Sequence, residues 1–200
     1  LAQQLAALTS NPWIRHIDTD AQGYAVMTVT PTQVQCQFKK VNRLVGSAAP
    51  TLRAVAHDGT LVDLAELRGR PVVIFFYPKD ETPGCTKEAC AFRDAWDRLA
   101  KRNAVLIGVS ADSAESHAKF AAKFGLPFEL LVDEPGKDGV PPLARKLGAW
   151  QEKSMYGKTY MGIARITYLV GPGGTVLQRW DKVKPEEHAA EVLEAIRAAK

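Results

Sequence analysis

Hydrophobic and polar residues follow two different patterns along the chain, and the change between them lies near residue 46. Before it, residues 24–30 and 34–41 alternate as strands do, and in the second run Val34, Cys36 and Phe38 share one face. These runs predict a β-hairpin with one apolar face. A small-residue stretch over 46–50 then indicates a linker. We therefore expect an N-terminal extension, residues 1–46, with a helix over 1–8 and this hairpin, and a second domain over residues 47–200.

From residue 51 onward, short continuous apolar runs alternate with longer stretches that carry apolar residues on one helical face. The run over 72–77 predicts a strand buried on both faces. The other predicted strands are 52–56, 60–63, 105–109, 128–132, 163–170 and 175–180, and the predicted helices are 84–102, 113–124 and 185–199. This order predicts an α/β domain of thioredoxin-like fold, in which helices flank a central mixed sheet.

Composition excludes several classes of protein. With 46% hydrophobic residues the chain is not disordered, and its longest apolar run, 71–78, is far shorter than the ~20 residues of a membrane span. The net charge is +4, but no basic run exceeds a pair, so we expect neither nucleic-acid nor membrane binding. The opening residues lack the layout of a signal peptide, so we expect a cytoplasmic protein, with the periplasm as the alternative.

Cysteine and histidine counts bear on metal and disulfide chemistry. Three cysteines cannot form a disulfide framework, and four histidines lie far apart without ligand spacing, so we expect no structural zinc site. His117 falls on a polar helix, where we expect it to be solvated.

One cysteine occupies a position suited to nucleophilic chemistry. A buried strand ends at Tyr77 and a helix begins near Gly84, so Cys85 lies in the first helical turn, where free amides and the helix dipole favour an anion. The thiolate is the nucleophilic form of cysteine. Thr82 is close enough to direct its hydroxyl at whatever Cys85 attacks, and Pro78 fixes the loop. The alternative is that Cys85 is merely a small buried residue.

Cys90 lies five residues beyond Cys85 on the same predicted helix. Ideal geometry separates their Cα atoms by about 8.7 Å, whereas a disulfide tolerates about 7 Å. The two thiols can therefore pair only if the first turns of the helix unwind. Thioredoxin-type pairs have two intervening residues, whereas this pair has four. The alternative for Cys90 is an ordinary helix cysteine.

Arg165 places a charge at the start of an otherwise apolar predicted strand. A buried guanidinium needs an anion, and the Cys85 thiolate is the obvious candidate. The alternative is a charge that faces solvent.

The loop and helix start resemble the peroxiredoxin signature Pro-x-x-x-Thr-x-x-Cys, formed here by Pro78, Thr82 and Cys85. Further matches resemble the peroxiredoxin Q, or bacterioferritin comigratory protein, branch of that family. They are Thr82-Pro-Gly-Cys-Thr, Cys90, Phe92-Arg93-Asp94, Gly148-Ala-Trp-Gln-Glu-Lys and the run over 156–170. The resemblance covers about residues 49–200. It implies a thiol peroxidase of thioredoxin-like fold that needs no metal or organic cofactor.

The resemblance also implies a role for each site residue. Cys85 would be the peroxidatic cysteine, Cys90 the resolving one, and Arg165 the residue that polarises the peroxide and stabilises the thiolate. Hydrogen peroxide and organic hydroperoxides would be the substrates. Thioredoxin or a similar dithiol protein would reduce the Cys85–Cys90 disulfide. We expect a monomer, with a weak dimer as the alternative.

Two rival functions and the first fifty residues complete the sequence-based hypotheses. A thiol-disulfide oxidoreductase would exchange disulfides without consuming peroxide, and a metal-binding module would need a third ligand beside Cys85 and Cys90. Residues 11–31 resemble the C-terminal tail of alkaline phosphatase D-type enzymes, but carry none of the metal ligands. Residues 1–46, which include Cys36, are expected to be a fusion remnant, or an extension that packs on the domain or on a second copy.

Overall fold

The computed structural model describes residues 23–29, 34–40, 44–155 and 158–199. The chain divides into two compact units, residues 1–43 and 44–200. The predicted helix over residues 1–8 lies outside the described part of the chain.

In the first unit, two strands form an antiparallel hairpin. They are β1 (Gly23–Val29) and β2 (Val34–Lys40), with Gly23 opposite Lys40 and Val29 opposite Val34. Cys36 lies within β2, opposite Met27. The two strands predicted from the alternating pattern are therefore confirmed.

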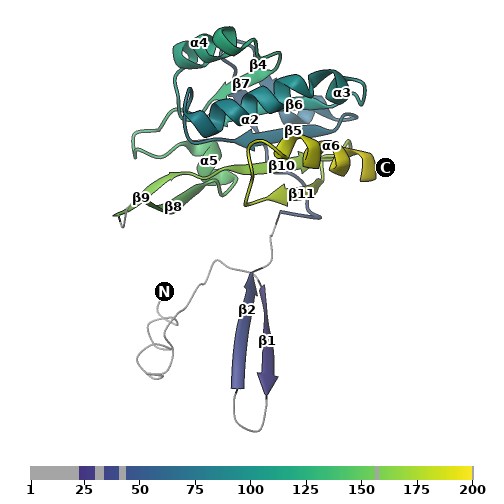
Figure 1. Ribbon diagram of the computed structural model, residues 1–200, viewed down its shortest axis with the longest axis vertical. Helices are drawn as coiled ribbons and strands as arrows, with labels where there is room; N and C mark the ends of the chain where they lie inside the picture. Colours follow the sequence, from purple (N-terminus) through teal and green to yellow (C-terminus); the bar gives the residue numbers. More distant parts are fainter. Residues whose placement is uncertain (1–22, 30–33, 41–43, 156–157, 200) are drawn as a thin grey trace. The chain divides into compact units, whose positions relative to one another are not determined.

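A five-stranded mixed sheet forms the centre of the second unit, in the order β11–β10–β5–β6–β7 (Figure 1). Its strands are β5 (Val72–Phe76), β6 (Val105–Ser110), β7 (Glu129–Val132), β10 (Ile166–Val170) and β11 (Val176–Trp180). The first three run parallel, while β10 is antiparallel to both β5 and β11. Every residue of β5 is buried, as its continuous apolar run predicts, because the strand has neighbours on both edges and layers on both faces.

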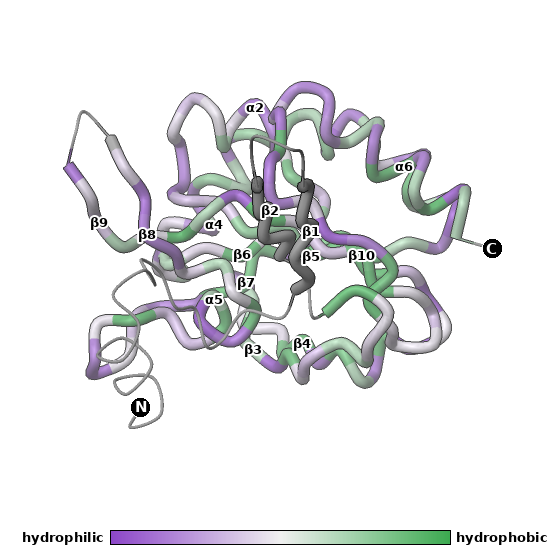
Figure 2. Tube along the Cα trace, turned by 90° about the horizontal axis from the view of Figure 1, so that it is seen from below, coloured by the Kyte–Doolittle hydropathy of each residue, from purple (hydrophilic) through white to green (hydrophobic). Residues whose placement is uncertain are grey.

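Helices cover the two faces of this sheet. They are α2 (Pro83–Asp94), α3 (Trp96–Ala100), α4 (Ala114–Phe124), α5 (Pro142–Lys146), α6 (His188–Ala198) and the 3-10 helix η1 (Leu64–Leu67). Phe75 and Tyr77 pack under α2, α3, α4 and α6, whereas Ile74 and Phe76 face a second core with η1 and α5. Figure 2 shows hydrophobic and hydrophilic residues alternating along α6, whose apolar side lies in the first core. The result is a three-layer α/β arrangement.

The helix boundaries follow local chemistry. Ser113 caps α4 by accepting a hydrogen bond from the Ser116 amide (3.3 Å), and Gly125 ends the helix at a φ of 59°. The helix predicted over 84–102 is divided at Ala95, where the backbone (φ −90°, ψ −3°) separates α2 from α3.

Two short hairpins lie beside the central sheet. The pair β3 (Arg53–Val55) and β4 (Leu61–Asp63) was predicted from its turn, where Gly59 adopts a φ of 88°. The pair β8 (Trp150–Met155) and β9 (Lys158–Ile163) was not predicted. The prediction of a single strand over 163–170 is wrong, since Ile163 ends β9 and Ile166 begins β10.

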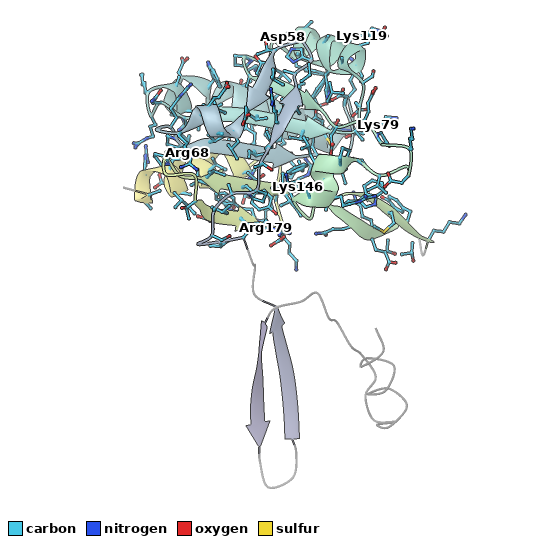
Figure 3. All side chains as sticks on the ribbon, turned by 180° about the vertical axis from the view of Figure 1, so that it is seen from behind. Asp58, Arg68, Lys79, Lys119, Lys146 and Arg179 are labelled. Carbon is cyan, nitrogen blue, oxygen red and sulfur yellow. The ribbon has the colours of Figure 1, made fainter. Side chains whose placement is uncertain are left out.

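The prediction that His117 is solvated is also wrong. Its side chain is fully buried on the inner face of α4. Lys119, two residues further along the same helix, is exposed (Figure 3).

Within the described residues, the structure contains no helix with the length and hydrophobicity of a membrane span.

Candidate active site

Cys85 lies in the first turn of α2, just beyond the carboxyl end of β5. Pro83 is the first residue of the helix and has no amide hydrogen to satisfy. The first backbone bond of this turn runs from the Thr86 amide to the Thr82 carbonyl (2.9 Å), so the amides of Gly84 and Cys85 precede it. The Cys85 side chain is 2% exposed. The helix start therefore presents the positive ends of its backbone dipoles to a buried cysteine.

Arg165 contacts this thiol from the short link between β9 and β10. Its Nη2 donates to Cys85 Sγ at 3.3 Å, and its Nη1 is bonded to the Glu88 carboxylate. Burial alone would lower the pKa of Arg165, but the negative charges of Glu88 and Cys85 outweigh burial and raise it. The structure brings this guanidinium and Cys85 into contact, and the ionised state of Cys85 stays a prediction.

Gly84 makes room for the guanidinium. A Cβ atom at this position would lie 3.3 Å from Arg165 Nη2, a tighter approach than side chains normally make. Glycine thus lets Arg165 cross the helix start and reach the sulfur.

Glu88, which the sequence reasoning missed, is the second anion at Arg165. It lies one helical turn beyond Cys85 and is completely buried. Burial is the main cause that raises the pKa of Glu88 to about 7, against the opposing effect of Arg165. Its Oε1 has no hydrogen-bond partner among the described residues. The spacing of three residues from Cys85 was the available signal, since it places both side chains on one helix face.

Lys153 on β8 is a second cation that sequence reasoning missed. It donates to the carbonyl of Ile163 (3.0 Å) and is partly buried. Burial and the nearby Arg165 lower the pKa of Lys153, while Cys85 acts in the opposite direction. The β8–β9 hairpin therefore supplies positive charge on the Arg165 side of the site.

Thr82 and Pro78 lie in the loop that joins β5 to α2. Thr82 is the N-cap residue of α2, and its hydroxyl donates to the Lys79 carbonyl (3.1 Å) rather than to the helix. Pro78 directly follows the buried Tyr77 and is half-buried. Both belong to the site by position, and their roles in the reaction stay predictions.

Cys90 lies on the same continuous helix as Cys85, and both are free thiols. Cys90 is partly exposed, whereas Cys85 is buried. Because α2 is unbroken between them, ideal helix geometry holds their Cα atoms about 8.7 Å apart. A bond between the two sulfurs requires this helix to unwind.

An open groove of about 460 Å³ adjoins the helix start. One side is formed by Pro83, Gly84 and Lys87, and the other by residues 183–187. Lys87 and Glu186 form an exposed ion pair across it (2.6 Å).

Comparison with known proteins identifies the family of this chain. The AhpC/TSA family model matches residues 45–179. The chain belongs to this family, the peroxiredoxins. The peroxiredoxin Bcp of Bacillus subtilis is 45% identical over 153 residues, which cover 76% of this chain and 94% of that protein. The chloroplastic peroxiredoxin Q of Oryza sativa subsp. japonica is 39% identical over 187 residues, covering 88% and 82%.

Solved structures agree with the sequence relatives. The bacterioferritin comigratory protein of Xanthomonas campestris, studied for alkyl peroxide reduction, superposes with a TM-score of 0.67 at 43% identity, covering 74% of this chain and 92% of that one. A Mycobacterium tuberculosis BcpB structure gives the same TM-score at 32% identity, covering 80% and 99%.

These findings confirm three predictions for this peroxiredoxin: the resemblance to the peroxiredoxin Q branch, the thioredoxin-like α/β fold and the activity of a thiol-dependent peroxidase. Peroxide is thus the substrate, and a thioredoxin-type dithiol is the general reductant of such enzymes.

Proposed function

We propose that Cys85 is the thiolate that attacks peroxide and that Arg165 holds both the thiolate and the peroxide oxygens. The observation that carries this proposal is the 3.3 Å hydrogen bond from Arg165 Nη2 to Cys85 Sγ at the start of α2. The guanidinium lies beside the sulfur, and we expect it, together with the helix-start amides, to stabilise the charge that develops on the leaving oxygen. Such fixed donors stabilise a transition state without having to reorganise.

In the attack, the sulfur of Cys85 forms a bond to one peroxide oxygen while the O–O bond breaks. The thiolate becomes a sulfenic acid, and the other oxygen leaves as hydroxide or alkoxide and takes a proton from water. Thr82 and Pro78 act at this step by fixing the loop that approaches the peroxide. Sulfur is oxidised by two electrons and the peroxide is reduced by two.

In the second step, Cys90 resolves the sulfenic acid. Its sulfur bonds to that of Cys85 and one water molecule leaves, so an intramolecular disulfide forms. The partial exposure of Cys90 and its place on the same helix support this role. An external dithiol then reduces the disulfide by exchange, which returns both thiols.

The groove beside the helix start supports organic hydroperoxides as substrates in addition to hydrogen peroxide. Its lining includes Pro83, Val183 and Pro185, which offer apolar surface to an alkyl chain. The groove is open, so chains of different length can lie along it.

We extend the proposal to the domain limits, the oligomeric state, the binding partners and the compartment. We place the catalytic domain over residues 47–200, with residues 1–46 as an extension, and expect a monomer that uses neither nucleic acid nor a membrane surface. Recycling by a dithiol protein requires a compartment in which that reductant stays reduced, which favours the cytoplasm.

Peroxide consumption coupled to NADPH through thioredoxin reductase and thioredoxin tests the proposal. The Cys85→Ser variant should lose all turnover, and Cys90→Ser should complete one turnover and then stop. Cys36→Ser serves as the matched control and should cycle as the parent does. Full cycling by Cys85→Ser would contradict the proposal. Disulfide exchange without any peroxide consumption would instead identify a thiol-disulfide oxidoreductase.

A further inference from the structure

A buried polar network holds the loop between β5 and α2, and its centre is Asp80. This residue lies midway between Pro78 and Thr82, and its side chain is only 3% exposed. The preceding residue, Lys79, is exposed (Figure 3). The carboxylate of Asp80 is therefore buried, and it belongs to the loop that leads to Cys85.

Three side chains surround the Asp80 carboxylate. The Tyr77 hydroxyl donates to Oδ1 (2.7 Å), and the Ser116 hydroxyl donates to Oδ2 (2.7 Å). His117 Nδ1 lies 2.9 Å from Oδ2. Burial alone would raise the pKa of Asp80, but the hydrogen bonds from His117, Ser116 and Tyr77 outweigh burial and lower it. Asp80 is therefore held as a carboxylate.

His117 connects the Asp80 carboxylate to the end of the sheet. Nδ1 faces the Asp80 carboxylate, and Nε2 lies 3.2 Å from the carbonyl oxygen of Leu131 on β7. The carboxylate and the carbonyl are both acceptors, so a ring N–H can donate to either, and the Tyr77 hydroxyl lies 3.3 Å from Nδ1. The buried contact between His117 and Asp80 joins α4 to the loop.

The loop backbone is fixed as well. The Asp80 amide donates to Asp112 Oδ2 (2.9 Å), beyond the end of β6, and Ser110 supports that carboxylate (2.6 Å). The next residue, Glu81, has a φ of 56°, which residues other than glycine rarely adopt. Such a conformation persists only where the surroundings impose it. Lys123 of α4 holds Glu81 by an ion pair (2.5 Å).

We propose that Asp80 and His117 are positioning residues that hold the loop, and with it the start of α2, in the conformation that attacks peroxide. This inference rests on the proposed roles of Cys85 and Cys90. The pair acts in opposite directions on the two steps. It favours attack, which needs the folded helix start, and it opposes disulfide formation, which needs that start to unwind.

The same cluster does not indicate a metal site. Asp80, Asp112 and His117 offer ligand atoms within 4.8 Å of one another. Both Asp80 oxygens and Asp112 Oδ2, however, already accept the hydrogen bonds described above, and His117 Nδ1 faces Asp80 Oδ2. These contacts hold the loop in place.

The Asp80→Asn variant of the full chain tests the proposal, because it keeps the shape of the side chain and removes its charge. Rapid-quench alkylation with mass spectrometry measures two rates: peroxide-dependent oxidation of Cys85, and conversion of the sulfenic acid to the Cys85–Cys90 disulfide. Hydrogen bonds to a charged group are worth about tenfold or more in an equilibrium constant. We therefore expect oxidation to slow about tenfold and disulfide formation to accelerate about tenfold.

Asp133→Asn is the matched control. Asp133 is a buried carboxylate at the end of β7 that accepts the amides of Leu143 (2.8 Å) and Ala144 (2.7 Å) and so caps α5. Its replacement should leave the ratio of the two rates unchanged. His117→Leu should behave as Asp80→Asn, whereas His117→Asn, which keeps an amide donor near the position of Nδ1, should recover part of the wild-type ratio.

Slowing of both steps in Asp80→Asn, or the same change in Asp133→Asn, would overturn the proposal. If Asp80→Asn does not fold, Ser116→Ala removes one donor and should shift the two rates in the same opposite directions by a few fold; equal slowing would again overturn it. Failure of the proposed function is distinguishable, because Cys85 would then not be oxidised in the wild-type protein.

Discussion

Replacing Glu88 by glutamine would remove a buried charge while keeping the shape of the side chain. Glu88 is completely buried and shares the single positive charge of Arg165 with Cys85. Burial raises the pKa of Glu88 to about 7, so the folded protein binds this proton more tightly than the unfolded chain does. The stabilisation is fully present below the unfolded value of 4.5 and is lost as pH rises through 7.

The size of this loss follows from linkage. The change in pKa from 4.5 to about 7, at about 1.4 kcal/mol per pKa unit, amounts to about 3 kcal/mol between the two limits. Most of it, about 2 kcal/mol, falls between pH 5 and pH 8. Glutamine resembles the protonated glutamate at every pH. The Glu88→Gln variant should therefore gain about 2 kcal/mol in unfolding free energy, relative to the parent, on going from pH 5 to pH 8.

Urea denaturation at pH 5 and pH 8 measures this difference. Both proteins should carry Cys85→Ser, so that no thiol ionises beside Arg165, and constant packing differences cancel between the two pH values. Glu66→Gln, at an exposed position in η1, is the control and should show no such change. An equal effect of Glu88→Gln at both pH values would mean that Glu88 is ionised throughout the range, and the reasoning would be refuted.

Three further predictions concern Gly84, His188 and the helical segment over residues 84–92. Gly84→Ala should displace the Arg165 guanidinium by a few tenths of an ångström and slow peroxide attack about tenfold in stopped-flow measurements; Gly173→Ala, where the added Cβ meets open space, should leave the rate unchanged. Burial, and to a lesser extent Arg165, lowers the pKa of His188 to about 4, so the unfolded chain binds its proton first and stability should fall as pH drops from 6.5 towards 4. This loss of unfolding free energy, up to about 3 kcal/mol, should be absent in His188→Asn. The same dependence of unfolding free energy on acid pH in both proteins would contradict the prediction. Residues 84–92 should exchange amide hydrogens faster in the disulfide form than in the reduced form, and equal protection in both would show that the disulfide forms without unwinding.

The elements predicted correctly from sequence are those whose hydrophobic pattern matches the burial of their residues. The apolar run at β5 and the Ser113 and Gly125 caps of α4 are local signals, and each element lies where it was expected. The hairpin β8–β9 was missed because β9 is exposed along most of its length and alternates weakly.

The errors at the site have a common physical cause, since burial of a polar side chain depends on partners that lie far away in sequence. His117 was expected in solvent, although its spacing to Phe120 and Ala121 places it on the buried face of α4. Glu88 was overlooked because its spacing of three residues from Cys85 indicates a shared helix face but not burial, and Arg165, its partner, lies 77 residues away. The position of Cys85 was predictable because a strand end and a helix start define it locally.

Trapping the sulfenic acid tests the central claim most directly. One equivalent of hydrogen peroxide is added to reduced Cys90→Ser protein, followed by dimedone and peptide mass spectrometry. The label should be found on Cys85, and Arg165→Lys should lower the rate of labelling by about 100-fold or more. A label on Cys36 in place of Cys85, or peroxide consumption without any labelled cysteine, would contradict the account.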